Sequence, residues 1–220
     1  MKLFVFETCP FCLRVRIFAG LKGLKPTIAT LTPGELPAEI AGRVERFSVP
    51  ILLDGDELIQ GSAEIVGQLD TYGKALLSDV QTSRDYEAWH ARIKAPLNVL
   101  CYPRMPALAP AELASDSAHE WFVREIPRRI GMSLVKAFCR TEASVAQVSE
   151  HLPEAYEFLA DPLRYDTIAT LADLQSLTMV AELQFPDAIG ATFKTLMRRA
   201  RISPFTAIDH CGRPVQEIIR

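Results

Sequence analysis

The stretch LFVFETCPFC, residues 3–12, joins a short apolar run to two thiols and decides the fold of this 220-residue chain. The apolar run predicts a buried strand, and residues 13–22 predict a helix directly after it. Cys9 is therefore expected at the start of that helix, where unpaired backbone N–H groups and the helix dipole stabilise a thiolate. Cys12 lies one turn deeper on the same face, within reach of a mixed disulfide formed on Cys9. The pattern predicts a redox-active dithiol.

A zinc site, or a pair of unrelated core thiols, is the alternative reading of two such cysteines. Zinc needs four ligands and usually takes a second closely spaced pair of Cys or His. The remaining candidates form no pair at the usual spacing, so we expect no metal: Cys101, Cys139, Cys211, His90, His119, His151 and His210. The other three thiols lack the strand–turn–helix context, so we expect no catalytic role for them.

Length and composition favour an enzyme with two domains. The 220 residues exceed the usual size of one domain, about 100–150 residues, and 49% of them are hydrophobic. A net charge of −3 with both signs dispersed argues against a nucleic-acid partner. We expect no membrane association, because no apolar stretch approaches the length of a membrane span. Five cysteines, an odd number, predict reduced thiols and a cytoplasmic location.

The pattern along the chain changes near residue 73. The first domain, 1–73, is predicted to be α/β in the order β-α-β-α-β-β-α, and after a linker at about 74–83 the second domain, 84–220, is predicted to be all-helical. The expected strands are 2–6, 26–31, 49–53 and 57–60, and the expected helices are 12–22, 35–46 (irregular), 62–71, 85–100, 111–130, 134–159, 171–182 and 188–198.

These motifs together resemble the glutaredoxins. The similarity lies in the CPFC motif at 9–12 after the first strand, Val49-Pro50 before the third strand, and Gly61-Ser62 at the start of the last helix of the first domain. The helical remainder, with Trp89 and Pro103-Arg104, resembles the large bacterial glutaredoxins of the glutaredoxin-2 type. The resemblance implies a thioredoxin-like domain and a helical domain, arranged as in glutathione transferases.

The resemblance also implies which residues bind glutathione. Val49-Pro50 should be a cis peptide, with the Val49 backbone pairing with the cysteinyl part of glutathione. Ser62 is expected to cap a helix whose first N–H groups receive the γ-glutamyl carboxylate, although it could be a cap and nothing more. Glu64 matches an acidic position near the glutathione amino group. Phe11 replaces the usual Tyr of the motif and keeps the bulk of the ring.

Three charged residues flank the dithiol. Glu7 would oppose the Cys9 thiolate by like charge, depending on where its carboxylate points. Arg14 and Arg16 lie on the helix of the motif, where one could approach the glycyl carboxylate of glutathione or both could face solvent.

The expected activity is that of a glutathione-dependent thiol–disulfide oxidoreductase. Cys9 and Cys12 would reduce protein–glutathione mixed disulfides and protein disulfides, with glutathione as cosubstrate and no bound cofactor. The expected partners are glutathione and glutathionylated or disulfide-bonded proteins, and we expect a monomer. Two alternatives stay open: a glutathione transferase that conjugates small electrophiles, and a non-catalytic thioredoxin-fold binding module.

Overall fold

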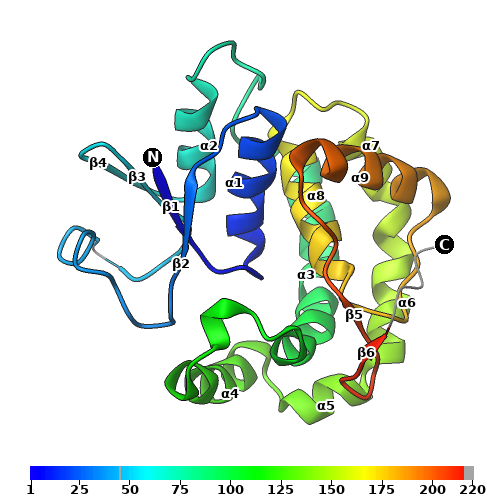
Figure 1. Cartoon of the computed structure of the whole chain (residues 1–220). Helices are drawn as coiled ribbons and strands as arrows, with labels where there is room; N and C mark the ends of the chain where they lie inside the picture. The colour runs from blue at the N-terminus through cyan, green and yellow to red at the C-terminus, as the bar shows by residue number, and fades with distance from the viewer. Residues whose placement is uncertain (45, 216–220) are drawn as a thin grey trace.

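A four-stranded sheet in the order β2-β1-β3-β4 organises the N-terminal domain (Figure 1). The computed structural model describes residues 1–44 and 46–215. Strand β2 runs parallel to β1, and β3 runs antiparallel to both β1 and β4. All four predicted strands of this domain are confirmed, within one or two residues at their ends: β1 (Lys2–Val5), β2 (Thr27–Thr30), β3 (Ile51–Asp54) and β4 (Glu57–Gln60).

The alternation of side chains along β1 divides the core into two parts. Leu3 belongs to the larger core, which residues of helices α1 (Pro10–Leu21) and α2 (Ser62–Asp70) also fill. Phe4 faces the opposite side of the sheet, where Ile40 and its neighbours complete a smaller core. Both faces of the sheet are therefore covered, one by helices and the other by the connection between β2 and β3.

That connection is where the predicted element order is wrong. Between β2 and β3 the described residues form turns, and the irregular helix predicted at 35–46 is absent from them. Pro37 cannot donate a helical hydrogen bond, and Gly34 and Gly42 have φ angles of 85° and 74°, outside the helical region. The described order is thus β-α-β-β-β-α, and the apolar residues of this segment cover the sheet instead of forming a helical stripe.

The rest of the described chain is mainly helical. Its elements are α3 (Arg84–Cys101), η1 (Tyr102–Leu108), η2 (Ala111–Leu113), α4 (Asp116–Ile130), α5 (Leu134–Cys139), α6 (Thr141–His151), η3 (Leu152–Glu154), α7 (Ala155–Leu159), α8 (Tyr165–Leu177), α9 (Asp187–Ala200), β5 (Ala207–Ile208) and β6 (Pro214–Val215), where η marks 3-10 helix.

Several of these helices differ in extent from the prediction. The helix predicted over 111–130 is interrupted before α4, because the Ser115 side chain accepts a hydrogen bond from the backbone of Ala118 and caps a new helix. The helix predicted over 134–159 is divided into α5, α6, η3 and α7. The helix predicted at 171–182 begins six residues earlier, at Tyr165, and ends at Leu177.

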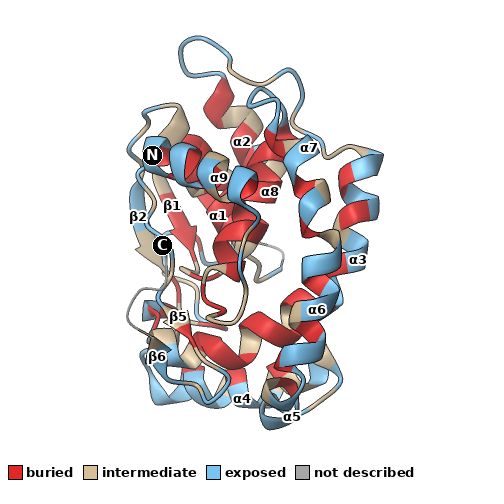
Figure 2. Cartoon of the chain, turned by 90° about the vertical axis from the view of Figure 1, so that its right-hand side faces the viewer, coloured by how far each residue is buried: buried red, intermediate tan, exposed pale blue. Residues whose placement is uncertain are grey.

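Helix α8 forms the centre of the contact between the two domains. All thirteen of its residues are buried (Figure 2). It packs against α1 and α7, and α1 also packs against α9. At the α1–α9 crossing, a Cβ atom added to Gly20 would lie 2.0 Å from the Ala200 carbonyl oxygen, so the backbones meet with no side chain between them. The helix that carries the dithiol is thereby held by both domains.

Arg104 ties the end of the described chain to the helical domain. Its side chain is fully buried and donates to the carbonyl of Leu100 (2.8 Å), the hydroxyl of Thr141 (3.1 Å), the carboxylate of Glu182 (3.0 Å) and the carbonyl of Ile208 in β5 (3.0 Å). The Pro103-Arg104 motif of the sequence therefore has a structural role.

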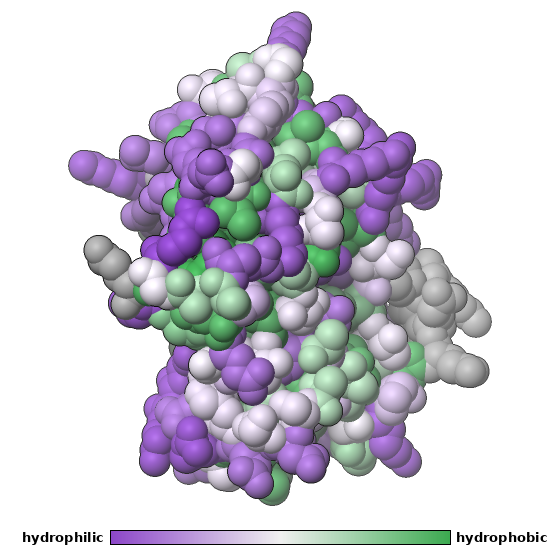
Figure 3. Space-filling view, turned by 60° about the vertical axis from the view of Figure 1, so that its left-hand side comes forward, coloured by the Kyte–Doolittle hydropathy of each residue, from purple (hydrophilic) through white to green (hydrophobic). Residues whose placement is uncertain are grey.

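Two further observations concern the surface and the helices as possible membrane contacts. On the face shown in Figure 3, hydrophobic side chains are interspersed among hydrophilic ones. Within residues 1–44 and 46–215, no helix combines the length and the apolar character needed to cross a bilayer.

Candidate active site

The dithiol lies at the junction of β1 and α1. Cys9 is the N-cap of α1, with an extended backbone (φ −71°, ψ 122°), and its carbonyl accepts the first hydrogen bond of the helix, from Leu13 (2.9 Å). The Cys9 side chain is partly exposed, whereas Cys12 is fully buried and its sulfur accepts a hydrogen bond from the Phe6 N–H at 3.4 Å. One thiol of the pair is thus accessible and the other lies beneath it.

The surroundings shift the pKa values of the two thiols in opposite directions. The pKa of Cys9 is lowered mainly because the Cys12 thiol donates a hydrogen bond to the Cys9 sulfur. The backbone N–H groups of Cys12 and Phe11 lower it further, whereas burial and the Glu112 charge raise it. Burial, followed by the interaction with Cys9, raises the pKa of Cys12 well above its ordinary value. The first thiol therefore ionises before the second.

The turn before Cys9 is fastened to the helical domain. The backbone N–H groups of Glu7 and Thr8 each donate to the Glu112 carboxylate at 3.0 Å, and the Thr8 hydroxyl donates to it at 2.8 Å. The Glu7 carboxylate is turned toward the backbone N–H of Ala111, 3.0 Å away. The Glu7 carboxylate therefore binds the backbone of the helical domain.

The residues expected to bind glutathione come from two adjoining segments. The Val49–Pro50 peptide is cis, as predicted, and the Pro50 carbonyl accepts a hydrogen bond from the Gly61 N–H at 3.4 Å. Val49 is half-buried, while Glu64 is exposed in the first turn of α2. The start of α2, with its free N–H groups, thus lies next to the cis peptide.

The predicted capping role of Ser62 is wrong. Gly61, with a φ angle of 100°, is the N-cap of α2, and Ser62 is the first helical residue. A Cβ at position 61 would lie 2.1 Å from a carboxylate oxygen of Glu64, so glycine leaves room for that side chain to fold back over the helix start. The Ser62 hydroxyl instead accepts a hydrogen bond from the Tyr165 hydroxyl at 3.0 Å.

Arg14 does not lie on a solvated helix face. Its side chain is buried, its guanidinium lies 4.8 Å from the centre of the exposed Phe11 ring, and it donates to the Tyr86 hydroxyl at 2.9 Å. The Tyr86 hydroxyl in turn donates to the Asp173 carboxylate at 2.7 Å, and His90 Nδ1 lies 3.0 Å from the same carboxylate. Burial, with the charge of Asp173, raises the pKa of Tyr86, which therefore stays protonated. This network links α1 to α3 and α8.

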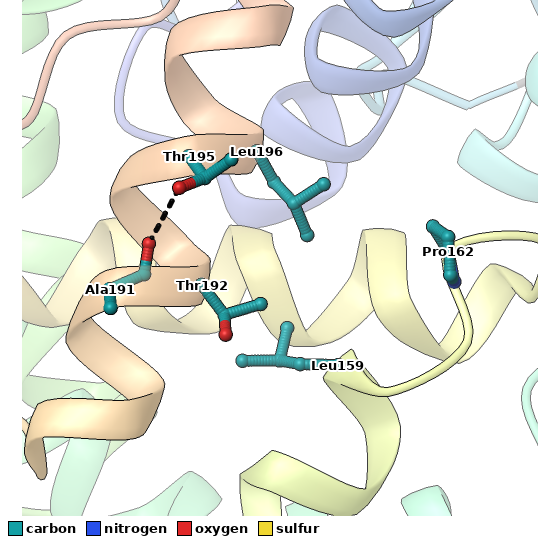
Figure 4. Close-up of a pocket in the computed structure, with 6 residues that line it drawn as sticks. All are labelled: Leu159, Pro162, Ala191, Thr192, Thr195 and Leu196. Atoms are coloured by element: carbon teal, nitrogen blue, oxygen red, sulfur yellow. Dashed lines mark hydrogen bonds between the residues drawn. The ribbon is translucent and has the colours of Figure 1, made fainter.

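A surface pocket between α7 and α9 is separate from this site (Figure 4). Its Thr192 and Thr195 hydroxyls donate to carbonyls of their own helix, those of Ala188 (3.0 Å) and Ala191 (2.9 Å). The pocket therefore offers mainly apolar contacts, and all its lining residues belong to the helical domain: Leu159, Pro162, Ala191, Thr192, Thr195 and Leu196. In the part of the chain that the structure describes, no three His, Cys, Asp or Glu side chains gather as metal ligands.

A thioredoxin-like sheet with a paired dithiol at a helix start, followed by a helical domain, defines a two-domain thiol–disulfide oxidoreductase with glutathione-transferase-like architecture. The sequence profile of "Glutaredoxin 2, C terminal domain" matches residues 85–208, and that of "Glutathione S-transferase, N-terminal domain" matches residues 3–72. The chain belongs to the glutaredoxin 2 family. The predicted family, fold class and class of enzyme, a glutathione-dependent oxidoreductase, are thereby confirmed.

Known relatives agree with this assignment. Glutaredoxin 2 of Escherichia coli K12 is 25% identical over 213 residues, which cover 92% of this chain and 97% of the relative. The crystal structure of glutaredoxin 2 from Salmonella typhimurium in complex with glutathione superposes with a TM-score of 0.82 at 23% identity, covering 92% of this chain and 95% of that one. FzlA from C. crescentus has a TM-score of 0.54 at 15% identity, over 90% of this chain and 88% of that one, and so is a more distant example of the fold.

Proposed function

We propose that the chain reduces protein–glutathione mixed disulfides and protein disulfides, with Cys9 as the nucleophile and Cys12 as the resolving thiol. The observation that carries this proposal is the contrast between the two sulfurs. Cys9 is accessible and has a lowered pKa, whereas Cys12 is buried and has a raised pKa. A thiolate attacks disulfides and a thiol does not, so Cys9 is suited to react first.

Two reaction branches follow from this order. In the first, the Cys9 thiolate attacks the glutathionyl sulfur of a mixed disulfide, the protein thiolate leaves, and Cys9 carries glutathione. The thiolate of a second glutathione then attacks that bond, which releases glutathione disulfide and restores the Cys9 thiolate. In the second, Cys9 forms a mixed disulfide with a protein, and Cys12 loses its proton and attacks Cys9. The reduced protein leaves, and two glutathione molecules reduce the Cys9–Cys12 disulfide.

Glutathione is proposed to bind across the segments next to the dithiol. The backbone of Val49, beside cis-Pro50, would pair with the cysteinyl part, and the N–H groups at the start of α2, from Ser62 on, would receive the γ-glutamyl carboxylate. Glu64 is proposed to lie near the amino group and Phe11 to form part of the wall. The relative from Salmonella typhimurium was solved with glutathione bound, which supports this assignment.

The wider setting is also part of the proposal. We propose that the protein works in the cytoplasm as a monomer, on glutathionylated or disulfide-bonded proteins, with glutathione as cosubstrate and no bound cofactor. All five cysteines are free thiols in the structure, which suits a reducing compartment. The domain boundaries at residues 73 and 84 remain a prediction, with which the two matched family profiles are consistent.

The test compares four Cys→Ser variants on a glutathionylated peptide and on a disulfide-bonded protein at fixed glutathione. Cys9→Ser should lose both activities, and Cys12→Ser should keep deglutathionylation and lose most reduction of protein disulfides. Cys139→Ser and Cys211→Ser are the matched controls, because both remove an exposed thiol far from the motif in sequence, and they should match the parent. Substantial turnover by Cys9→Ser would contradict the proposal. Conjugation of chlorodinitrobenzene without disulfide reduction would favour the transferase alternative, and inactivity in both assays would favour a binding module.

A further inference from the structure

A buried carboxylate of the helical domain grips the turn that presents Cys9. Glu112 is 4% exposed and lies in η2, about a hundred residues after the dithiol. Its two oxygens accept hydrogen bonds from the Glu7 N–H, the Thr8 N–H and the Thr8 hydroxyl, at 3.0, 3.0 and 2.8 Å. These donors belong to the two residues directly before Cys9, so three bonds from one side chain fix the backbone that leads into α1.

The turn before Cys9 also holds the segment that carries Glu112. Glu7 sends its own carboxylate back to the Ala111 N–H, the residue before Glu112, at 3.0 Å. Two short segments from different domains thus exchange hydrogen bonds in both directions. Neither segment has a regular pattern of backbone hydrogen bonds at this point. One lies between β1 and α1, and the other is a three-residue 3-10 helix. The position of the turn therefore depends on this exchange.

Among the described residues, no Lys, Arg or His forms an ion pair with Glu112. Of the basic side chains on α1, Arg14 is directed to the Tyr86 hydroxyl, and Arg16 donates to the Glu7 carbonyl at 3.4 Å. The second acid here, Glu7, binds the Ala111 N–H. The pKa of Cys9 is lowered overall, chiefly by the Cys12 hydrogen bond, and that of Cys12 is raised, chiefly by burial; the Glu112 charge acts with burial in the raising direction at both thiols.

We propose that Glu112 is a positioning residue of the dithiol, through which the helical domain fixes the turn that presents Cys9. The proposal rests on the function proposed above, in which Cys9 is the attacking thiolate. Glu112 has two effects that substitutions can separate: its hydrogen bonds hold the turn, and its charge restrains ionisation of the thiol.

The variants Glu112→Gln and Glu112→Ala separate these effects. Glutamine retains an acceptor for the two Thr8 donors but removes the charge and faces the Glu7 N–H with its own donor. Alanine removes the charge and all three bonds. Glu120→Gln and Glu120→Ala are the matched controls, because Glu120 is an exposed acid of the same domain, on α4. Thr8→Val removes the bonds of the hydroxyl, to Glu112 (2.8 Å) and to the Met105 sulfur (3.7 Å), and keeps the volume of the side chain.

Two readouts are taken in a Cys139→Ser, Cys211→Ser background, in which Cys9 is the accessible thiol. The first is the pKa of Cys9, from the pH dependence of alkylation by iodoacetamide. The second is kcat and KM for a glutathionylated peptide. Thermal unfolding shows which variants are folded at the assay temperature. Alkylation does not require turnover, so a parent protein that fails to reduce the peptide would count against the proposed function and leave the test of Glu112 intact.

We expect Glu112→Gln to lower the pKa of Cys9 relative to Glu120→Gln. Glu112→Ala should lower kcat about tenfold with a smaller change in KM, because a displaced nucleophile loses reactivity. If Glu112→Ala does not fold, Thr8→Val replaces it, and it should lower kcat by a smaller factor because the two backbone bonds to Glu112 remain. The proposal is overturned if Glu112→Gln leaves the pKa of Cys9 at the control value, or if the folded Ala variant, or Thr8→Val in its place, keeps the parent kcat.

Discussion

Replacement of Gly20 by alanine tests whether α1 is clamped against the helical domain. The added Cβ would lie 2.0 Å from the Ala200 oxygen and 2.9 Å from its Cα, and these are backbone atoms that cannot rotate away. Ordinary carbon contacts lie at about 3.5 Å, so α9 would have to withdraw by roughly 1.5 Å. Overpacking of this kind costs about 1–3 kcal/mol, and the higher helix propensity of alanine returns about 1 kcal/mol. We expect a net loss of up to about 2 kcal/mol.

Urea unfolding followed by circular dichroism measures this loss, and Gly67→Ala is the matched control. Gly67 also lies inside a helix, α2, but a Cβ there would meet Val80 at an ordinary 3.7 Å. That variant should therefore gain up to about 1 kcal/mol from helix propensity alone. Both glycines lie inside a helix, so alanine gains the same helix propensity at each. The two substitutions should nevertheless change the free energy of unfolding in opposite directions.

The same variant should leave the chemistry of the thiol almost unchanged. Gly20 lies eleven residues after Cys9, or about 16 Å along the helix axis. The pKa of Cys9 in Gly20→Ala should match that of the parent, as measured by alkylation. Equal stability changes in Gly20→Ala and Gly67→Ala would refute the reasoning, because they would mean that α1 and α9 do not meet backbone to backbone.

Two further substitutions test the site. Cys12→Ala removes the donor that does most to lower the pKa of Cys9, so the rise of alkylation rate with pH should move to higher pH; a move to lower pH would contradict this assignment. Tyr165→Phe removes the hydrogen bond to Ser62 and should raise KM for glutathione roughly two- to tenfold, as expected for about 0.5–1.5 kcal/mol, whereas Tyr156→Phe, at an exposed tyrosine of the same domain, should have the parent KM.

The parts of the structure that local pattern determines could be predicted from the sequence. The strand before the motif, the helix start at Cys9 and the change to helices after residue 73 depend on neighbouring residues, and the structure has the strand and the helix start where predicted. The connection between β2 and β3 was misread because its apolar residues cover a sheet face and its glycines adopt positive φ angles. The start of α8 was missed because a helix buried on every side has no polar face to mark its period.

The contacts that shape the site are mostly invisible in the sequence. Glu112 is separated from Thr8 by more than a hundred residues and sits in a short 3-10 helix with no motif of its own. Tyr165 and Arg14 likewise acquire their partners only when the two domains meet. No local periodicity encodes such pairs. Ser62 shows the same limit at short range, since a glycine directly before it takes the capping position.

The burial of Arg104 has a consequence for synthesis on the ribosome. Its partners are spread over positions 100, 141, 182 and 208, so the last acceptor is made about a hundred residues after the arginine itself. A buried cation without its acceptors is costly, so the guanidinium should stay hydrated until the segment with Ile208 has been made. We expect nascent chains that stop at residue 206 to be digested faster by protease than chains that include residue 215. Burial of Arg104, and with it full protease resistance of the helical domain, would thus require the segment that contains β5.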